Sequence, residues 1–363
     1  MNPVGASSPT LLREPEWLAR RSAHEARVRA WTDPHQRRAA RGEKHPVEDF
    51  LFEYYRFRPS WLKRWHPGPD VVLLGAAARD YLRWPEYHEV YATLGRSDAA
   101  ERSLPSYNVP AERWNPASGR VEAIPIRENA SGGRVPPEST ARTRLGAAPG
   151  EGVKLDTGAF DPKRRDSLAW MLGLLRQTAE RPPQFACFGL HEWAMVYRQT
   201  PEEIRHRAWP LRFPPEEVAR IVESQPVCCS HFDAFRFFTP AARPLNRLQP
   251  ERATAGQFEQ RGCLHANMDL YKWAFKLAPF TPSELIADCF ALARDIRETD
   301  MRASPYDLQK LGYAPIAIET PEGRAEYEIH QRGFADRSQP LRARLIALCE
   351  RLLQDIVHSP PPL

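Results

Sequence analysis

The sequence predicts a mainly α-helical protein, built as a multi-helical single globular domain with at most a small β element. Apolar residues recur at helical spacing in the C-terminal half, as Leu168, Met171, Leu172 and Leu175 do. Thr-Pro pairs of the kind that begin helices precede several of these stretches. Apolar runs typical of strands are few and far apart, which excludes a doubly wound sheet.

The N-terminal segment, residues 1–44, is expected to form a basic helical arm ahead of a main helical domain over residues 45–363. Between positions 13 and 44, nine Lys or Arg stand against five acidic residues. The helical pattern is expected to break near Asp33–Pro34, because proline interrupts helix hydrogen bonding. Such an arm fits contact with DNA phosphates, and a solvated helix face is the structural alternative. The predicted DNA-backbone residues are Arg37, Arg38 and Arg41.

Short elements are expected after the arm. Residues 45–55 are dense in aromatic side chains and predict a short helix, and residues 79–84 predict a helical turn. Apolar runs predict strands at 71–75 and 121–126. Residues 127–152 are rich in Gly, Pro, Ser and Ala and lack large apolar side chains, so we expect a disordered loop there.

Three Thr-Pro pairs are predicted to begin helices, at Thr200, Thr281 and Thr320. Threonine can cap free backbone amides, and proline fits the first helical position. Glu203 and Glu284 stand where a capping box places its acidic residue. The helix after Thr281 is expected to run to about Glu298, and a separate last helix is expected over residues 341–357.

The cysteine pattern indicates a reducing compartment. The six cysteines show no CxxC spacing, no secretory signal precedes them, and no apolar run approaches the roughly 18 residues of a membrane helix. We therefore expect a cytoplasmic protein with reduced cysteines and no membrane partner. The net charge of +5 favours anionic partners only weakly. The chain has neither a nucleotide-binding glycine pattern nor the G-x-S-x-G turn of hydrolases.

Four segments crowd polar and aromatic residues together, at 189–198, 229–238, 263–273 and 300–307. On a helix His265 and Asp269 share one face, and His231 and Asp233 do so on an extended chain. A carboxylate beside a histidine suits acid–base chemistry and also the surroundings of a metal ligand. Buried pairs that only satisfy each other are the structural alternative. We expect the four segments to converge in one cleft.

The same segments suit a pocket for a planar, nucleobase-like ring. Aromatic side chains offer faces for stacking, and polar groups offer hydrogen bonds and contacts with phosphate. Aromatic residues at helical spacing are also common in cores, which is the structural alternative. The predicted substrate-binding residues are His191, Trp193, Arg236, Asn267, Tyr271 and Arg302.

A divalent metal site is an alternative for these segments. Such a site needs three or more ligands of the His, Asp or Glu type. The pair His191–Glu192 is not the start of a zincin motif, because Met195 occupies the place of the second histidine. The candidate ligands in this alternative are His191, His231, His265, Asp233 and Asp269.

Six longer motifs have residues distinctive enough for a family comparison. They are HPVEDFLFEYYRFRP (His45–Pro59), RWHPG (Arg64–Gly68), GLHEWAMVYR (Gly189–Arg198), CSHFDAFRFFTPAARPLN (Cys229–Asn246), GCLHANMDLYKWAFKL (Gly262–Leu277) and DMRASPYDL (Asp300–Leu308). In these motifs the chain resembles a bacterial family, common in actinobacteria, whose members are generally labelled 3-methyladenine DNA glycosylase. The family lies outside the helix-hairpin-helix type. The resemblance covers nearly the whole chain apart from residues 127–152.

The resemblance implies release of an alkylated purine from DNA by hydrolysis of its N-glycosidic bond, without a cofactor. A carboxylate near the sugar carbon would stabilise the oxocarbenium-like transition state and activate water. Asp233 is the first choice for this role. The full set of candidate catalytic residues is Asp233, Glu192, Asp269, His231 and His265. Two alternatives stay open: a metal-dependent enzyme acting on a small aromatic or nucleobase-like substrate, and a non-catalytic nucleic-acid-binding protein.

Overall fold

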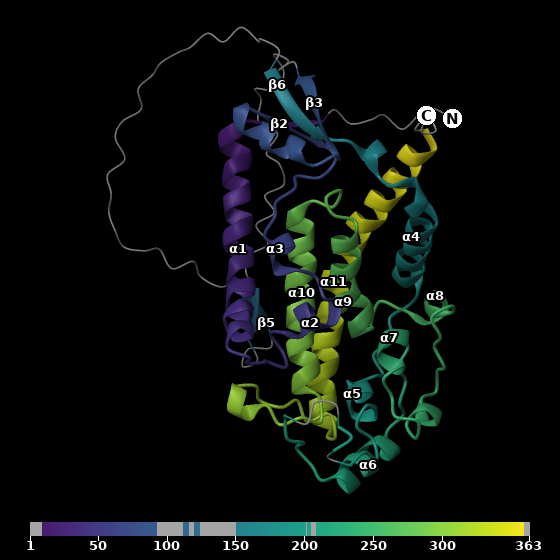
Figure 1. The fold of residues 1–363 in the computed structure, drawn as a ribbon. Helices are drawn as coiled ribbons and strands as arrows, with labels where there is room; N and C mark the ends of the chain where they lie inside the picture. Colours follow the sequence, from purple (N-terminus) through teal and green to yellow (C-terminus); the bar gives the residue numbers. More distant parts are fainter. Residues whose placement is uncertain are drawn as a thin grey trace.

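The computed structural model describes residues 9–92, 112–115, 120–123, 150–200, 202–204 and 208–358. Over these residues the protein is mainly α-helical, with long helices packed side by side and a small sheet at one end (Figure 1). The predicted fold class is thereby confirmed. Within the described residues, no helix has the length and apolar character needed to span a membrane.

The long helices make up the body of the molecule. They are α1 (Glu14–Ala40), α4 (Arg165–Glu180), α9 (Leu264–Lys276), α10 (Ser283–Arg302) and α11 (Pro321–His358). The shorter helices are α2 (Phe50–Tyr55), α3 (Pro59–Leu62), α5 (Leu190–Ala194), α6 (Pro215–Ser224), α7 (Phe232–Phe235) and α8 (Ala255–Phe258). The 3-10 turns are η1 (Ala76–Arg83), η2 (Thr157–Ala159), η3 (Pro162–Arg164), η4 (Arg243–Leu245) and η5 (Gln309–Leu311). The turn predicted at 79–84 corresponds to η1.

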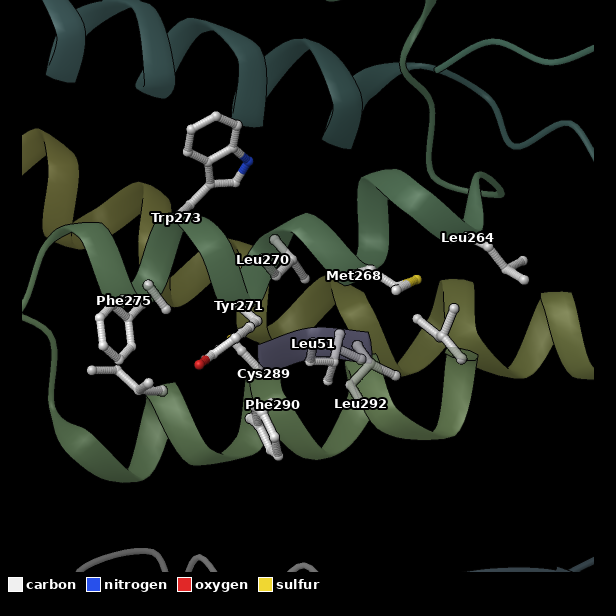
Figure 2. Packing of buried hydrophobic residues seen from close by; sticks show 14 of the residues in the cluster. Leu51, Leu264, Met268, Leu270, Tyr271, Trp273, Phe275, Cys289, Phe290 and Leu292 are labelled. Carbon is white, nitrogen blue, oxygen red and sulfur yellow. The ribbon is translucent and has the colours of Figure 1, made fainter. Parts of the chain in front are cut away.

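The core lies between α9, α10 and α11, where buried apolar side chains interleave (Figure 2). Tyr271 of α9 packs edge-on against Phe290 of α10, with ring centroids 4.9 Å apart. Trp273 points instead towards α4, where it meets Trp170 at 5.8 Å. The predicted apolar stripe of α10 is confirmed, since all its members are buried: Leu285, Cys289, Leu292 and Ile296.

The predicted interruption at Asp33–Pro34 is wrong, because α1 runs through it unbroken. Packing on both sides of the proline offsets the missing backbone hydrogen bond. Before it, Trp31 packs on Phe290 with ring centroids 5.0 Å apart. After it, the guanidinium of Arg38 binds the carboxylate of Asp49 at 2.5 Å. The buried face of α1 consists of Trp17, His24, Val28 and Thr32.

A small sheet of order β1–β2–β6–β3 covers one end of the helices (Figure 1). Its strands are Thr10–Leu12, Val71–Leu74, Gly150–Leu155 and Tyr87–Ala92. β1 and β2 are parallel, and the other pairs are antiparallel. The strand predicted at 71–75 is therefore confirmed. The predicted strand at 121–126 overlaps β5 (Arg120–Ala123), which pairs with β4 (Glu112–Asn115), and its last three residues lie outside the described part of the chain.

The loop predicted at 127–152 is wrong at its last three residues, and residues 127–149 lie outside the described part of the chain. Gly150–Gly152 begin β6, with Gly152 paired to Leu74 and Val90. A Cβ at Gly152 would lie 2.6 Å from the side chain of Val72. The glycine therefore allows β2 and β6 to approach closely, whereas composition alone suggested a loop.

The predicted separate last helix is part of α11, which begins after Thr320 and runs through Pro340. At its start the Thr320 hydroxyl accepts a hydrogen bond from the Gly323 amide at 3.0 Å. Beside the proline, the buried guanidinium of Arg342 donates to Ser338 Oγ at 3.2 Å and to Asn267 Oδ1 of α9 at 2.7 Å. These buried contacts hold the helix together where one backbone hydrogen bond is missing.

The Thr-Pro pair at Thr200 does not begin a helix in the described residues, so this prediction is wrong. Residues 202–203 form a turn. The Thr200 amide donates to the Glu203 carboxylate at 2.9 Å. One half of the capping box therefore forms without a helix behind it, and the next helix, α6, starts only at Pro215.

The buried His66 is expected to make the fold acid-sensitive. Burial, and then the charge on nearby Arg64, lower its pKa from 6.5 to about 4. As the pH falls from 6.5 towards 4, the unfolded chain binds the proton first, so the native state loses stability, by about 3 kcal/mol at most. His66→Gln should flatten this part of the pH dependence of the unfolding free energy in urea titrations. An unchanged slope, equal to that of the exposed control His88→Gln, would contradict the assignment.

Candidate metal centre

Three potential metal ligands converge where α5, α9 and α10 meet. His191 lies on α5, His265 on α9 and Asp300 near the end of α10. One ligand atom from each lies within 4.8 Å of the others. His191 Nε2 is 2.9 Å from Asp300 Oδ1, and the two imidazole rings meet edge-on with centroids 4.6 Å apart. Two imidazoles and a carboxylate form a ligand set that suits Zn²⁺, Fe²⁺ or Mn²⁺.

The backbone before α5 sets the position of His191. Gly189 has a φ of +75°, in the left-handed region that favours glycine. A Cβ there would lie 3.2 Å from the Cβ of Ala303, so the turn sits tightly against the end of α10. The indole of Trp193 donates a hydrogen bond to the Ala303 carbonyl at 2.9 Å. Helix α5 is thus fixed to the same part of α10 that carries Asp300.

His191 and Asp300 form a close buried ion pair. His191 Nε2 and Asp300 Oδ1 are 2.9 Å apart. The two atoms are close enough to be two ligands of one ion, and a buried histidine–aspartate ion pair without a metal is the structural alternative.

The charge states around the cluster depend strongly on neighbours. Burial alone would raise the pKa of Asp300, but the facing imidazole of His191 outweighs it and lowers that pKa well below the ordinary value. Burial alone would lower the pKa of His191, but the Asp300 charge raises it. Desolvation, and then the charge on His191, lower the pKa of His265. His265 is therefore neutral, with a lone pair that can bind a metal.

Cys187 lies on the other side of the His191 ring. Its sulfur is 3.5 Å from His191 Nδ1. When Nδ1 donates its proton to this sulfur, Nε2 is the nitrogen that could bind a metal, in place of the proton that the Asp300 charge favours there. Partners of this kind fix the tautomer and orientation of metal-binding histidines.

A small cavity adjoins two of the three candidate ligands, His191 and His265. Its volume is about 20 Å³, which is enough for one water molecule or one ion. His191 and His265 line it, together with the thiols of Cys187 and Cys229 and the side chains of Tyr327 and Gln331. Cys187 and His265 are partly exposed, so they mark the side from which the cavity can be reached.

A second polar group lies next to the cluster. His231 stacks on His265 with ring centroids 5.4 Å apart. Its Nε2 is 3.5 Å from carboxylate oxygens of both Glu259 and Asp269, which outweigh burial and raise the pKa of His231. Asp269 also accepts a hydrogen bond from the Tyr55 hydroxyl at 2.7 Å and pairs with Lys272. This group can exchange protons beside the candidate metal ligands.

The structure thus brings part of the predicted site together. His191, His231, His265 and Asp269 surround one region. Asp233 lies further out, with Arg236 at 3.0 Å and Lys272 at 3.5 Å. Of the five predicted metal ligands, two belong to the three-residue cluster: His191 and His265.

Several residues that were predicted to be catalytic or substrate-binding form structural contacts around the cluster instead. Glu192 forms a buried ion pair with Arg297 at 2.8 Å. Trp193, Asn267 and Tyr271 are buried. Asn267 donates to the Arg261 carbonyl at 2.9 Å. At the end of α10, the guanidinium of Arg302 donates to the Ala314 carbonyl at 2.9 Å and to Glu326 at 3.2 Å.

The three predicted DNA contacts differ in their surroundings. Arg38 is largely covered and pairs with Asp49 and Glu48. Arg37 and Arg41 are exposed near the end of α1. Arg38 is therefore held within the fold, while the other two point to solvent.

The sequence predicts that the segment of Asp300 joins the other three in one cleft, but it assigns no role to Asp300 itself, nor to Glu259, Arg297 or Cys187. Asp300 stands in a motif that was singled out, DMRASPYDL, but nothing in its spacing connects it with His191, more than one hundred residues earlier. The available signal is a pair of opposite charges on the buried side of α10. Arg297 and Asp300 stand three residues apart, beside the buried Ile296 and Met301. Buried charges of this kind mark functional sites.

Comparison with known proteins yields no relative on which function could be based. No family model matches the chain, and no curated protein or solved structure matches it. The resemblance to the glycosylase family therefore stays a prediction. What the fold and the cluster define is a mainly helical protein with a candidate metal centre.

Proposed function

We propose that the protein is a metal-dependent enzyme that acts on a small substrate, with a divalent metal, Zn²⁺ first, held by His191, His265 and Asp300. One observation carries the proposal. The three ligand atoms lie within 4.8 Å of one another, with His191 Nε2 2.9 Å from Asp300 Oδ1.

The ligand set supports catalysis more than a purely structural metal. Structural zinc sites are usually closed by four protein ligands, whereas three protein ligands leave a position for water or substrate. A metal there would supply a nucleophile by lowering the pKa of bound water to about 7. Other residues of the chain orient the proposed ligands. Cys187 fixes the His191 ring. Arg297, 3.4 Å from Asp300, holds the Asp300 carboxylate. His231, stacked on His265, is placed to accept or return a proton.

The cavity limits the substrate. At about 20 Å³ it is far smaller than the roughly 300–1,000 Å³ of pockets that hold drug-sized ligands. This volume holds only the ion or one water molecule, so even a small polar substrate would need the entrance beside Cys187 and His265 to widen. A nucleobase-like ring would need the entrance to widen further.

The glycosylase hypothesis has less support from this geometry. A flipped purine does not fit the cavity, and the three candidate carboxylates already face cations: Asp233 faces Arg236, Asp269 faces Lys272, and Glu192 faces Arg297. Its test is base release from alkylated duplex DNA, which Asp233→Asn should reduce by about 10²–10⁴-fold. The binding-only hypothesis predicts DNA association that falls steeply with salt and is not followed by turnover.

The enzymatic proposal is tested by metal removal and reloading. Protein stripped with a chelator is assayed against a panel of small esters, amides and amidines, before and after addition of Zn²⁺, Fe²⁺ or Mn²⁺. We expect turnover to return with one of these metals in the wild type and not in Asp300→Asn. Activity that is equal in the stripped and reloaded protein would contradict the proposal.

A further inference from the structure

A second pocket lies far from the candidate metal centre, between α1, α3 and η1. Its volume is about 250 Å³. Two acidic side chains line it, Glu25 and Asp80. The cationic side chains that line it are more numerous: Arg21, Arg29, Lys63, Arg64 and Arg83. The pocket therefore carries a clear positive excess on a chain whose overall charge is only +5.

Two of these cations are held by carboxylates of the protein. Lys63 binds Asp33 at 2.7 Å. Arg21 lies 3.9 Å from Glu25. Because Lys63 and Arg21 already pair with carboxylates of the protein, they are not free for a ligand.

The remaining three cations form no ion pair with a carboxylate among the described residues. Arg64 lies over the ring of Trp61 at 5.2 Å, and Arg83 lies over the ring of Trp84 at 4.2 Å. Arg29 is exposed on α1. Contact with an aromatic face orients a guanidinium but leaves its N–H groups available. Three arginine side chains thus line one pocket without an ion pair to a carboxylate of the described residues.

An aromatic floor keeps the pocket open and rigid. Trp65 and Tyr81 are buried, and Trp84 is half-buried. The Trp65 indole donates to Glu284 at 2.9 Å, and the Tyr81 hydroxyl donates to the Trp65 carbonyl at 3.0 Å. Trp17 stacks behind Trp65. The Trp65 indole N–H and the Tyr81 hydroxyl already form hydrogen bonds within the protein. The arginines therefore determine which ligand the pocket selects.

We infer that this pocket binds the phosphate or diphosphate group of a small phosphorylated molecule. A phosphate carries nearly two negative charges and three acceptor oxygens, which match unpaired guanidinium forks better than a single carboxylate does. The volume is close to the lower end of ligand pockets. Trp84 provides an apolar surface beside the arginines for the organic part of the molecule.

The site is separate from the proposed metal centre. Trp65 contacts Glu284 at the start of α10, whereas Asp300 lies sixteen residues further along the same helix. Sixteen residues of α-helix span about 24 Å. The inference therefore does not depend on the proposed enzymatic function, and each can fail alone.

The test is calorimetric titration of the full chain with pyrophosphate and, separately, with adenosine triphosphate, in moderate salt. We expect saturable binding of at least one of the two, with quenching of tryptophan fluorescence. Arg64→Ala and Arg83→Ala should each weaken it about tenfold, as expected for loss of a charge-assisted hydrogen bond. The matched control is Arg220→Ala, an exposed arginine of α6 outside the pocket, which should leave the affinity unchanged. Melting temperatures confirm that the variants are folded.

Three outcomes would overturn the inference. The first is that neither pyrophosphate nor adenosine triphosphate binds to the folded wild type. The second is that both pocket variants and the Arg220 control weaken binding equally, which would indicate a general charge effect. The third is that short duplex DNA binds and depends on Arg64 and Arg83 while both small compounds fail, which would assign the surface to nucleic acid.

Discussion

Replacing Arg297 by Met is expected to lower the free energy of unfolding by about 3–5 kcal/mol, because it leaves buried carboxylates without their cation. The Arg297 guanidinium lies 2.8 Å from Glu192 and 3.4 Å from Asp300. All three residues are buried. The guanidinium also lies 3.8 Å above the Phe50 ring, which adds to the loss.

The measurement is urea unfolding of the chelator-treated protein, so that metal binding does not enter the comparison. The matched control is Arg337→Met, since Arg337 forms an ion pair of similar length with Asp295, at 2.6 Å, but both side chains are about half exposed. An exposed pair of this kind contributes less than about 1 kcal/mol. Equal losses of unfolding free energy in Arg297→Met and Arg337→Met would contradict a larger stabilising contribution from the buried ion pair.

Removing a proposed ligand is expected to weaken metal binding by more than about 100-fold, since even partners of the ligands change affinity by about 10–100-fold. His265→Ala is the cleanest variant, because His265 is neutral and partly exposed, so its loss leaves no buried charge behind. Asp300→Asn keeps the shape of the side chain and removes its charge. The affinity for Zn²⁺ is measured by competition with a chromogenic chelator.

Two controls separate direct ligation from support. Cys187→Ala should weaken binding by about tenfold, because the Cys187 sulfur contacts His191 Nδ1 and so orients the ring that would bind the metal. His88→Ala removes an exposed histidine of β3 and should have no effect. If His265→Ala binds Zn²⁺ as tightly as the wild type, His265 is not a ligand and the proposed centre is wrong.

The sequence was sufficient to predict the fold class, because the apolar stripe of a helix is formed by residues that lie close together in the sequence. The stripe of α10 from Leu285 to Ile296 is an example. Helix boundaries at prolines were less predictable. Pro34 and Pro340 both lie inside helices, since buried side chains before and after each proline are fixed by other elements. Local propensity does not contain those tertiary contacts.

The candidate site was predictable only in part, for the same reason. His191 and His265 drew attention because they stand in polar aromatic segments. Their third companion, Asp300, is brought in by the tight turn at Gly189 and by the packing of α5 against Ala303. Glu259 and Arg297 are likewise placed by tertiary packing. Residues that meet from distant elements leave no spacing in the sequence.

The most direct test of the metal centre is elemental analysis of the folded protein together with X-ray absorption spectroscopy of its bound metal. The protein is purified without chelators and then incubated with Zn²⁺, Fe²⁺ or Mn²⁺. The proposed centre predicts one tightly bound metal per chain, with two imidazole ligands and carboxylate or water oxygens at about 2.0–2.2 Å. It also predicts loss of that metal in His265→Ala. A folded wild-type protein that retains no metal under any of these conditions would contradict it.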